Sequence, residues 1–444
     1  MAAAAREAGT QPAGGRFRWA ICALLFFVIT INYVDRQVIG VLKPIIEDDL
    51  GWSEVDYGNI VTAFQASYAI GLLVVGRLLD RVGTRLGLAI TICLWSLAAA
   101  LHGAAHTVLH FVLARIGLGF AEAGAYPGAV KSVAEWFPRK ERALGVGILN
   151  AGANVGVLMT PIVGLWVAAI YGWRAAFVAT GALGFVLLFA WLKLYRPPEE
   201  HPRLSAAERA YIEQDGEDAA GPKLTWREAL RHRQTWAFAA GKFFTDPVWY
   251  LFLFWLPDFL AKTQGMELFP KGDSGILATI GPALIGVYLL ADVGSIAGGW
   301  LSSHLIKRGW AVNPARKVTL LIAACCALPL LFVVDAPNPG VAVLIIGLAT
   351  AGHQAFSSNI FTLISDMYPR RAVATVAGIG GAAGSIGGIL MAQATGWTLE
   401  LAGSYVPIVT YAAFGYLIAL TIIQVLVPRL ERAPMRENGA PTPA

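Results

Sequence analysis

Four charged residues stand inside segments of the sequence that are otherwise apolar. Asp35 and Arg36 lie side by side in the stretch NYVDRQ, with apolar runs on both sides, and Arg115 and Glu122 interrupt a later apolar segment. A charged side chain at the centre of a membrane helix costs about 2.5–3.5 kcal/mol on insertion scales, so it persists where it faces a polar cavity and has a partner. Groups of this kind can bind an anion, carry a proton or do both.

The spacing of these four residues limits how they can pair. Asp35 and Arg36 are neighbours in sequence, so about 100° of helix rotation separates their side chains, and each needs a partner on another helix. Arg115 and Glu122 are two turns apart on one helical face. We therefore predict that Asp35 pairs with Arg115, and that Arg36 lies near Glu122 or is free for a substrate anion.

Such an arrangement could couple the binding of an anion to the binding of a proton. A carboxylate bound to Arg36 would weaken the attraction between that arginine and Glu122 or Asp35. The acid could then take up a proton, so that the two ligands bind together. The alternative is that the ion pairs only hold two helices together, although a buried ion pair is weak evidence of net stability.

The composition indicates which elements must position these charges. The chain has 444 residues, of which 56% are hydrophobic and 14% charged, whereas a soluble domain has about 25% charged residues. Windows of about 20 apolar residues, each long enough to cross a bilayer as a helix, recur along the chain. We predict an all-α membrane protein with twelve transmembrane helices. The predicted spans are residues 17–42, 56–79, 86–105, 108–131, 141–168, 174–195, 235–261, 275–302, 316–334, 339–362, 373–396 and 404–427.

The distribution of charge predicts the orientation in the membrane. Basic residues cluster after the second, fourth, eighth and tenth spans, whereas the first loop on the opposite side is acidic. By the positive-inside rule both termini are then cytoplasmic, as an even number of spans requires. The net charge of +5 is therefore interpreted as a topology signal and not as a signal of nucleic-acid binding. We expect a multi-pass protein of the cytoplasmic (inner) membrane.

The sequence divides into two similar halves. EWFPR in the first half matches DMYPR in the second, and each precedes a Gly- and Ala-rich helix, which favours parallel six-helix repeats of a transporter. In the polar segment between the halves, Ser205 stands three residues before Glu208, the spacing of a helix capping box. The predicted regions are a cytoplasmic N-terminal tail (1–16), a first six-helix bundle (17–195), a cytoplasmic linker with short surface helices (196–233), a second six-helix bundle (234–428) and a cytoplasmic C-terminal tail (429–444).

The segment GRLLDRVGTRLG, residues 76–87, resembles the G-x-x-x-D-R-x-G-x-R signature between helices 2 and 3 of the major facilitator superfamily. The resemblance implies two pseudo-symmetric six-helix bundles and a cytoplasmic gate in which Asp80 caps and pairs with basic groups. The implied gate residues are Gly76, Asp80, Arg81, Gly83 and Arg85. The corresponding segment of the second half, GGWLSSHLIKRG, has Ser303 and His304 where the acid and the arginine are expected, so we predict an asymmetric gate.

Further segments resemble the anion:cation symporter family within that superfamily. They include NYVDR, ARIGLGFAEAGAYPG and EWFPRKERA, while FFTDPVWYLFLFWLPDFL, NAGANVG and GHQAFSSNIFTLISDMYP are most similar to the hexuronate-transporter branch. The resemblance implies proton-coupled import of sugar acids such as glucuronate or galacturonate. It also implies that Asp35 and Glu122 act in proton coupling, and that Arg36 and Arg115 bind the anion and pair with the acids.

Other polar and aromatic residues at membrane depth are candidate substrate contacts, because sugar hydroxyls need donors and acceptors on a largely aromatic wall. Tyr33 and Tyr68 match positions associated with substrate in the family. The remaining candidates are Gln65, Asn150, Asn154, Trp249, Tyr250, His353, Gln354 and Ser357. The alternative for each is structural: a hydrogen bond between helices, an aromatic ring against lipid or a hydrogen-bonded histidine. Lys242 is interpreted as a lysine near a helix end that extends its ammonium to the interface.

The sequence favours a transporter over an enzyme or a sensor. It contains no nucleotide-binding, catalytic-triad, zinc or dinucleotide motif. We expect no metal and no cofactor, with a proton gradient as the energy source. The expected partners are a small organic anion, protons and the lipid bilayer, without nucleic acid, and the protein is expected to be monomeric. The alternatives are a symporter of another organic anion, such as galactonate or glucarate, and a non-transporting membrane sensor.

Overall fold

Helices account for the apolar segments throughout the computed structural model, which describes residues 16–214, 225–268, 279–368 and 370–433. The first half contains α1 (Phe17–Leu50), α2 (Glu54–Val82), α3 (Thr84–Leu101), α4 (Val108–Glu122), α5 (Ala125–Trp136), α6 (Arg139–Tyr171) and α7 (Trp173–Leu194). Two short helices follow, α8 (Ala206–Glu213) and α9 (Trp226–Ala229). The second half contains α10 (Arg233–Gln264), α11 (Ile280–Lys307), α12 (Val312–Cys325), α13 (Pro339–Met367), α14 (Arg370–Ala402) and α15 (Val406–Leu426).

These helices make twelve membrane crossings, because α4 and α5 form one crossing. Among the described residues, ten helical segments are long and apolar enough to cross a membrane. Helices α2 and α10, with 29 and 32 residues, complete the twelve. The predicted fold class, an all-α membrane protein of two six-helix bundles, is confirmed.

The predicted spans differ from the observed helices at several ends, and two of these differences concern the charged residues. The first span was expected to end at residue 42, but α1 continues to Leu50, because the charged residues of its last turns find partners on other helices. The fourth was expected as one helix over 108–131 and is instead broken at Ala123 and Gly124, directly after Glu122. The first residues of the predicted eighth span, 275–278, lie outside the described part of the chain.

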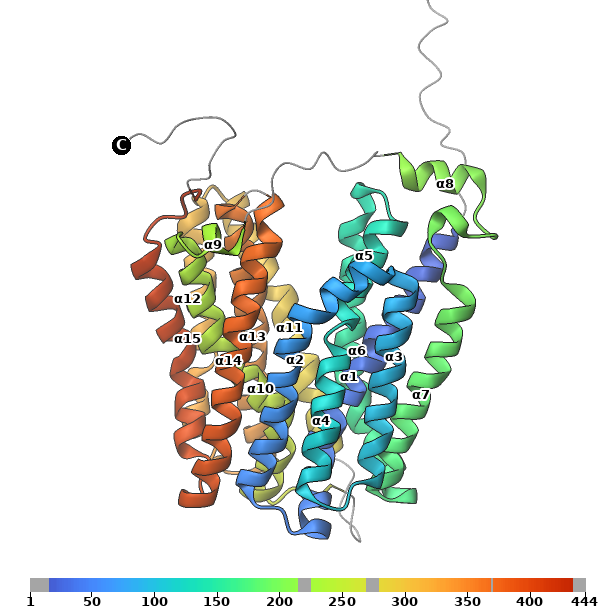
Figure 1. Cartoon of the computed structure of the whole chain (residues 1–444). Helices are drawn as coiled ribbons and strands as arrows, with labels where there is room; N and C mark the ends of the chain where they lie inside the picture. Colours follow the sequence, from blue (N-terminus) through green and yellow to red (C-terminus); the bar gives the residue numbers. More distant parts are fainter. Residues whose placement is uncertain (1–15, 215–224, 269–278, 369, 434–444) are drawn as a thin grey trace, which may run out of the picture.

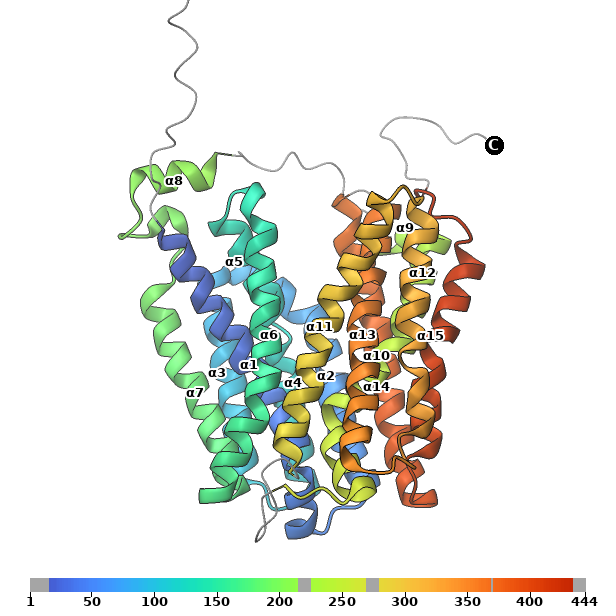
Figure 2. The ribbon, with the colours of Figure 1, turned by 180° about the vertical axis from the view of Figure 1, so that it is seen from behind.

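The two bundles touch at one end and diverge toward the other (Figures 1 and 2). We call the end where α1 begins and α15 ends the terminal face, and the opposite end the far end. The contacts that join the bundles lie toward the far end. There, the Tyr57 hydroxyl donates to the Phe254 carbonyl at 2.7 Å, and the Gln393 amide donates to Asn59 at 3.0 Å and to Thr62 at 2.8 Å.

The linker helix α8 caps the start of α1. The Ser205 hydroxyl accepts a hydrogen bond from the Glu208 amide at 3.2 Å, as the capping-box spacing predicts. The Glu208 carboxylate, however, accepts from the backbone amides of Phe17 at 3.2 Å and Arg18 at 3.1 Å. A carboxylate at a helix N-terminus satisfies amides that have no partner inside the helix. Helix α8 is therefore attached to the first bundle.

Close packing of α4 on α2 depends on a glycine of α4. A Cβ atom on Gly119 would lie 2.4 Å from the Phe64 carbonyl oxygen and 2.4 Å from the Ser67 hydroxyl oxygen. A Cβ atom on Gly117, two residues earlier, would meet only the Ala98 methyl group at 3.6 Å, an ordinary contact. Gly119 thus sets the distance between the helix that carries Glu122 and its neighbour.

Gly119→Ala is expected to destabilise the protein, whereas Gly117→Ala is not. The added methyl group at position 119 must displace backbone, and overpacking of this kind typically costs about 1–3 kcal/mol. Thermal unfolding of the purified protein in detergent should show a lower Tm for Gly119→Ala and an unchanged Tm for the matched control Gly117→Ala. Equal Tm values for the two variants would contradict the packing shown here.

Candidate functional site

Arg36 of α1 lies at the centre of a buried polar site. Its Nε donates to Oε2 of Glu122 at 3.0 Å, and the two side chains are 9% and 0% exposed. Its guanidinium carbon lies 4.8 Å from the ring centre of Tyr33 and 4.6 Å from that of Tyr68. A cation over aromatic faces is stabilised electrostatically. The predicted proximity of Arg36 and Glu122 is therefore present, and both predicted tyrosines lie against the same guanidinium.

Asp35 and Arg115, predicted to pair, interact electrostatically but form no hydrogen bond. Arg115 donates through Nη1 to the Arg36 carbonyl oxygen at 3.1 Å, and its Nε and Nη2 have no hydrogen-bond partner among the described residues. Neither carboxylate oxygen of Asp35 has one either, although the residue is buried.

The site as a whole holds two acids and two arginines with unused bonding capacity. Beyond the atoms named above, Oε1 of Glu122 is buried without a partner within the described ranges. Buried polar atoms are usually hydrogen-bonded, and those left over in a membrane protein mark places for water, protons or a ligand. Four opposite charges that sum to zero can accept an anion and a proton without a net change of charge.

Gln65 connects this site to the second bundle. Both polar atoms of its buried amide lack a hydrogen-bond partner in the described structure. A Cβ atom on Gly388 of α14 would lie 2.4 Å from Gln65 Oε1 and 2.5 Å from the ring of Tyr250. Gln65 and Tyr250 thus meet at one glycine, and Tyr250 interacts electrostatically with Arg36. Two further predicted site residues are therefore brought to the arginine.

The predicted asparagines of α6 lie on the terminal-face side of this group. Asn150 is exposed and accepts a hydrogen bond from the Tyr126 hydroxyl at 3.0 Å. Asn154, one turn later, is half-buried. On the same helix, a Cβ atom on Gly156 would lie 2.7 Å from Cβ of Tyr33, so α6 packs directly beside the arginine site.

The candidates on α10 and α13 form a separate cluster inside the second bundle. The rings of Trp249 and His353 stack, with centres 5.0 Å apart and an interplanar angle of 8°. His353 Nδ1 lies 2.9 Å from the Tyr416 hydroxyl. Gln354 and Ser357 are half-buried on α13. The stack gives Trp249 and His353 a packing role within their bundle, and it does not bring them into contact with Arg36.

The sequence signature for a gate falls at the turn between α2 and α3. The surroundings of Gly76 and the side chain of Asp80 lie outside what the structure describes. Arg81 is exposed, and Gly83 joins the two helices with φ = 81°, a conformation that glycine adopts without steric cost. Arg85 donates to the Leu192 carbonyl oxygen at 2.8 Å and so links α3 to α7.

An ion cluster at the far end was missed in the sequence. Lys43 of α1 lies 2.5 Å from Asp258 of α10, 2.7 Å from Glu47 and 3.2 Å from Glu54. Lys262 of α10 contacts the same three carboxylates, at 2.7 Å from Glu47 and 3.2 Å from Asp258. We call these five residues the far-end ion cluster. It joins the two bundles, and the sequence signal for it was the i,i+4 pairs Lys43–Glu47 and Asp258–Lys262.

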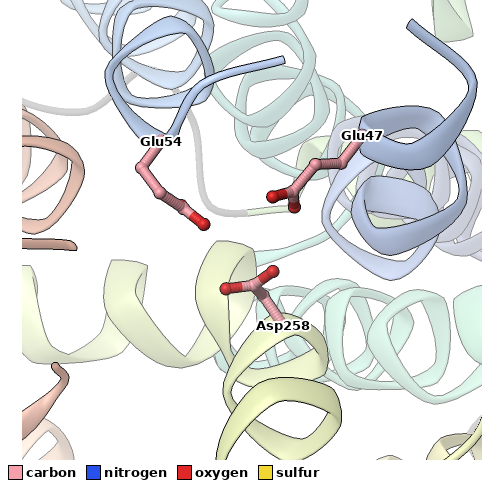
Figure 3. A group of neighbouring side chains, drawn as sticks. All are labelled: Glu47, Glu54 and Asp258. Atoms are coloured by element: carbon pink, nitrogen blue, oxygen red, sulfur yellow. The ribbon is translucent and has the colours of Figure 1, made fainter. Parts of the chain in front are cut away.

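The three carboxylates of the far-end ion cluster point toward one another (Figure 3). Their separation would suit a metal ion by geometry alone. The ammonium groups of Lys43 and Lys262, however, already contact all three, and they supply the positive charge that the acids require. The cluster therefore gives no support for a metal site.

Known proteins of similar sequence indicate the family of this chain. A family model described as Major Facilitator Superfamily matches residues 25–392. The chain is 31% identical to the hexuronate transporter of Escherichia coli strain K12, over 95% of this chain and 97% of that protein. It is 33% identical to the probable L-galactonate transporter of the same strain, over 82% and 79% of the two chains. It is 29% identical to the probable galactarate/D-glucarate transporter GudP of Bacillus subtilis strain 168, over 97% of each.

A solved structure shares the fold. It is that of a bacterial homolog of the human lysosomal transporter Spinster in an inward-facing and occupied conformation. The TM-score is 0.68 with 21% sequence identity, over 95% of this chain and 96% of that one. With the family model and the helical arrangement, this shows that the chain belongs to the Major Facilitator Superfamily, a family of membrane transporters and not of enzymes.

Proposed function

We propose that the protein imports a sugar-acid anion together with protons, and that the anion is a hexuronate such as glucuronate or galacturonate. The observation that carries the proposal is the buried Arg36 guanidinium, held between Tyr33 and Tyr68 and bonded to one oxygen of Glu122. A sugar acid offers a carboxylate to an arginine and hydroxyl groups to tyrosines. The names of the relatives support this class of substrate, and galactonate and glucarate are the alternative substrates.

Proton coupling follows from competition for Arg36. In the structure, Glu122 neutralises this arginine. A substrate carboxylate that binds Arg36 takes over that role, and an unpaired carboxylate at a buried position is unfavourable unless it binds a proton. Asp35, which has no hydrogen-bond partner among the described residues, is a second proton site. No cofactor is needed, because the proton gradient supplies the energy. One proton per monovalent anion is electroneutral, and a second would move a charge worth about 2.3 kcal/mol per 100 mV.

Transport would proceed by alternating access to Arg36. We assign the terminal face to the cytoplasm, in agreement with the positive-inside rule, and the far end to the outside. The structure then corresponds to a state in which the far-end ion cluster closes the external side. Substrate can enter from outside only after the contacts of that cluster between α1 and α10 have separated.

Arg36→Gln is expected to reduce uptake of labelled glucuronate by roughly tenfold or more in proteoliposomes with an imposed pH gradient, acidic outside. Loss of a charge-assisted hydrogen bond to a carboxylate is worth about 1.5–3 kcal/mol, which lowers affinity by roughly tenfold or more. The wild-type protein should accumulate glucuronate, and a protonophore should abolish the accumulation. Arg174→Gln is the matched control, because Arg174 forms an exposed pair with Asp49 at the far end.

The outcomes of this experiment separate the proposals. Uptake of galactonate or glucarate without uptake of glucuronate would change the substrate and keep the mechanism. If no acid of this class shows gradient-driven flux, proton-coupled import of sugar acids is wrong. Equal glucuronate uptake by the wild type and Arg36→Gln would remove Arg36 from the binding site.

A further inference from the structure

A further ion pair, with both members on α10, stands in the second bundle. Lys242 Nζ lies 2.7 Å from Asp246 Oδ1, one helical turn away, and the two side chains are 10% and 16% exposed. Lys242 was interpreted from the sequence as a lysine that extends to the interface, and this interpretation is wrong, because its ammonium is bonded inside the bundle and lies 4.9 Å from the ring centre of Phe361. Ionisable groups at membrane depth usually have a function.

Contacts between α1 and α10 show the depth of this pair. Along α1, Gly40 meets Leu253 and Phe254, Lys43 meets Asp258, and Glu47 meets Lys262. The residue numbers of the contacting positions rise together along both helices, so α1 and α10 run in the same direction. Contacting positions differ by a nearly constant amount in residue number. The same difference places position 36 level with position 250, and position 32 level with position 246. Asp246 therefore lies about one helical turn, roughly 5.4 Å along the axis, from the depth of Arg36 toward the terminal face.

Tyr250 connects the two groups. It interacts electrostatically with both Arg36 and Asp246, and Asp246 precedes it by one turn on the same side of α10. The Asp246 carboxylate and the Tyr250 ring both lie against glycines of α14, at Gly384 and Gly388. The bundles diverge toward the terminal face (Figures 1 and 2), and Asp246 lies one turn nearer to that face than Tyr250.

The pair retains bonding capacity beyond its own contact. An ammonium has three donors and an ionised carboxylate about four acceptor sites, and the bond between the two groups uses one of each. Both side chains remain slightly exposed. A donor and an acceptor side by side suit vicinal hydroxyl groups, whereas a neutral pair gives no net attraction to a second carboxylate.

We propose that Lys242 and Asp246 form a second substrate subsite, which binds the end of the sugar acid that lies away from the carboxylate held by Arg36. This inference rests on the proposed function and specifies its substrate class. Because Asp246 neutralises Lys242, the subsite selects a polyhydroxy monocarboxylate over a dicarboxylate. Removal of the Asp246 charge leaves an uncompensated ammonium, which would favour a substrate with a carboxylate at both ends.

The test is a competition experiment with reconstituted protein. Uptake of labelled glucuronate is inhibited with unlabelled galactonate, a monocarboxylate, and with glucarate, a dicarboxylate, and the ratio of their inhibition constants is measured. In Asp246→Asn the ratio should shift toward glucarate by about tenfold, as expected for about 1.4 kcal/mol of charge-assisted binding. In Lys242→Gln, the Asp246 carboxylate remains without its cation, so the ratio should shift toward galactonate.

Glu213→Gln is the matched control, because Arg209 and Glu213 form an i,i+4 pair of similar geometry, at 3.0 Å, on the surface of α8. It should leave the ratio unchanged. A purely structural pair would lower thermal stability without changing the ratio, so a constant ratio in both α10 variants overturns the inference. If one of the two variants fails to fold, the direction in which the other variant shifts the ratio of inhibition constants supports or overturns the inference. Absence of uptake and inhibition by all three acids in the wild type contradicts the proposed function instead.

Discussion

Glu122→Gln is expected to abolish proton-driven accumulation of the sugar acid while leaving exchange of substrate across the membrane. Glutamine keeps the size of the side chain and can still accept a hydrogen bond from Arg36, but it cannot take up the proton that we assign to Glu122. A gradient of one pH unit is worth about 1.4 kcal/mol. It therefore supports about tenfold accumulation for electroneutral symport with one proton, and in the variant the ratio should fall to about one.

Two measurements on the same proteoliposomes check this prediction. Net uptake under a pH gradient measures coupling, and counterflow of labelled against unlabelled substrate at equal pH measures binding and conformational change. The control is Glu199→Gln, an exposed residue of the linker, for which both activities should match the wild type. Gradient-driven accumulation by Glu122→Gln at the wild-type level would show that the proton is carried elsewhere, with Asp35 as the next candidate.

Lys43→Met is expected to open the far end. The Lys43 side chain is 1% exposed and contacts an Asp258 side chain that is 0% exposed. Removing Lys43 leaves its three carboxylate partners with one ammonium, that of Lys262, and the loss of one partner of a buried pair costs about 3–5 kcal/mol. Because the pair joins α1 to α10, that energy is lost only in the state in which the far end is closed. A change of this size shifts a two-state equilibrium by roughly a hundredfold or more.

Labelling of a cysteine introduced at Gln393 reports this opening. Gln393 of α14 bonds to α2 at the far end and is half-buried there, so a cysteine at this position should react faster with a membrane-impermeant maleimide when the bundles separate. The four native cysteines, of which Cys325 is exposed, are first replaced. Faster labelling is expected in Lys43→Met, and a smaller increase in the matched variant Lys262→Met, whose side chain is 42% exposed. Equal labelling of Lys43→Met and the parent protein would contradict a gating role for the cluster.

The sequence predicted the fold and the centre of the site because both depend on local patterns. Apolar length defines the spans, and an arginine inside an apolar segment requires an acid on another helix, which Glu122 provides. The pairing of Asp35 with Arg115 could not be decided in this way. That pairing depends on how each helix is rotated about its own axis. It also depends on the Arg36 backbone carbonyl oxygen, which accepts a hydrogen bond from Arg115 as a carboxylate would.

Tertiary contacts explain the groups that the sequence did not reveal. The far-end ion cluster combines the end of α1, the start of α2 and the end of α10, so no single segment shows it. Lys242 and Asp246 are only four residues apart in sequence, but only the packing of α10 against α13 and α14 shows that the pair is enclosed. The sequence did not reveal the helix break after Glu122 either, because the apolar composition of α4 continues into α5.

The attachment of α8 to the first bundle limits how far the transporter can open. Glu208 holds α8 to the start of α1, and α9 lies beside α14, where a Cβ atom on Gly378 would meet the Trp226 ring at 3.8 Å. Helices α8 and α9 are therefore held to different bundles, and the chain between them connects the two. From residue 214 to residue 225 a fully extended chain reaches about 40 Å. The length of this chain segment thus sets an upper limit on the separation of the two bundles at the terminal face.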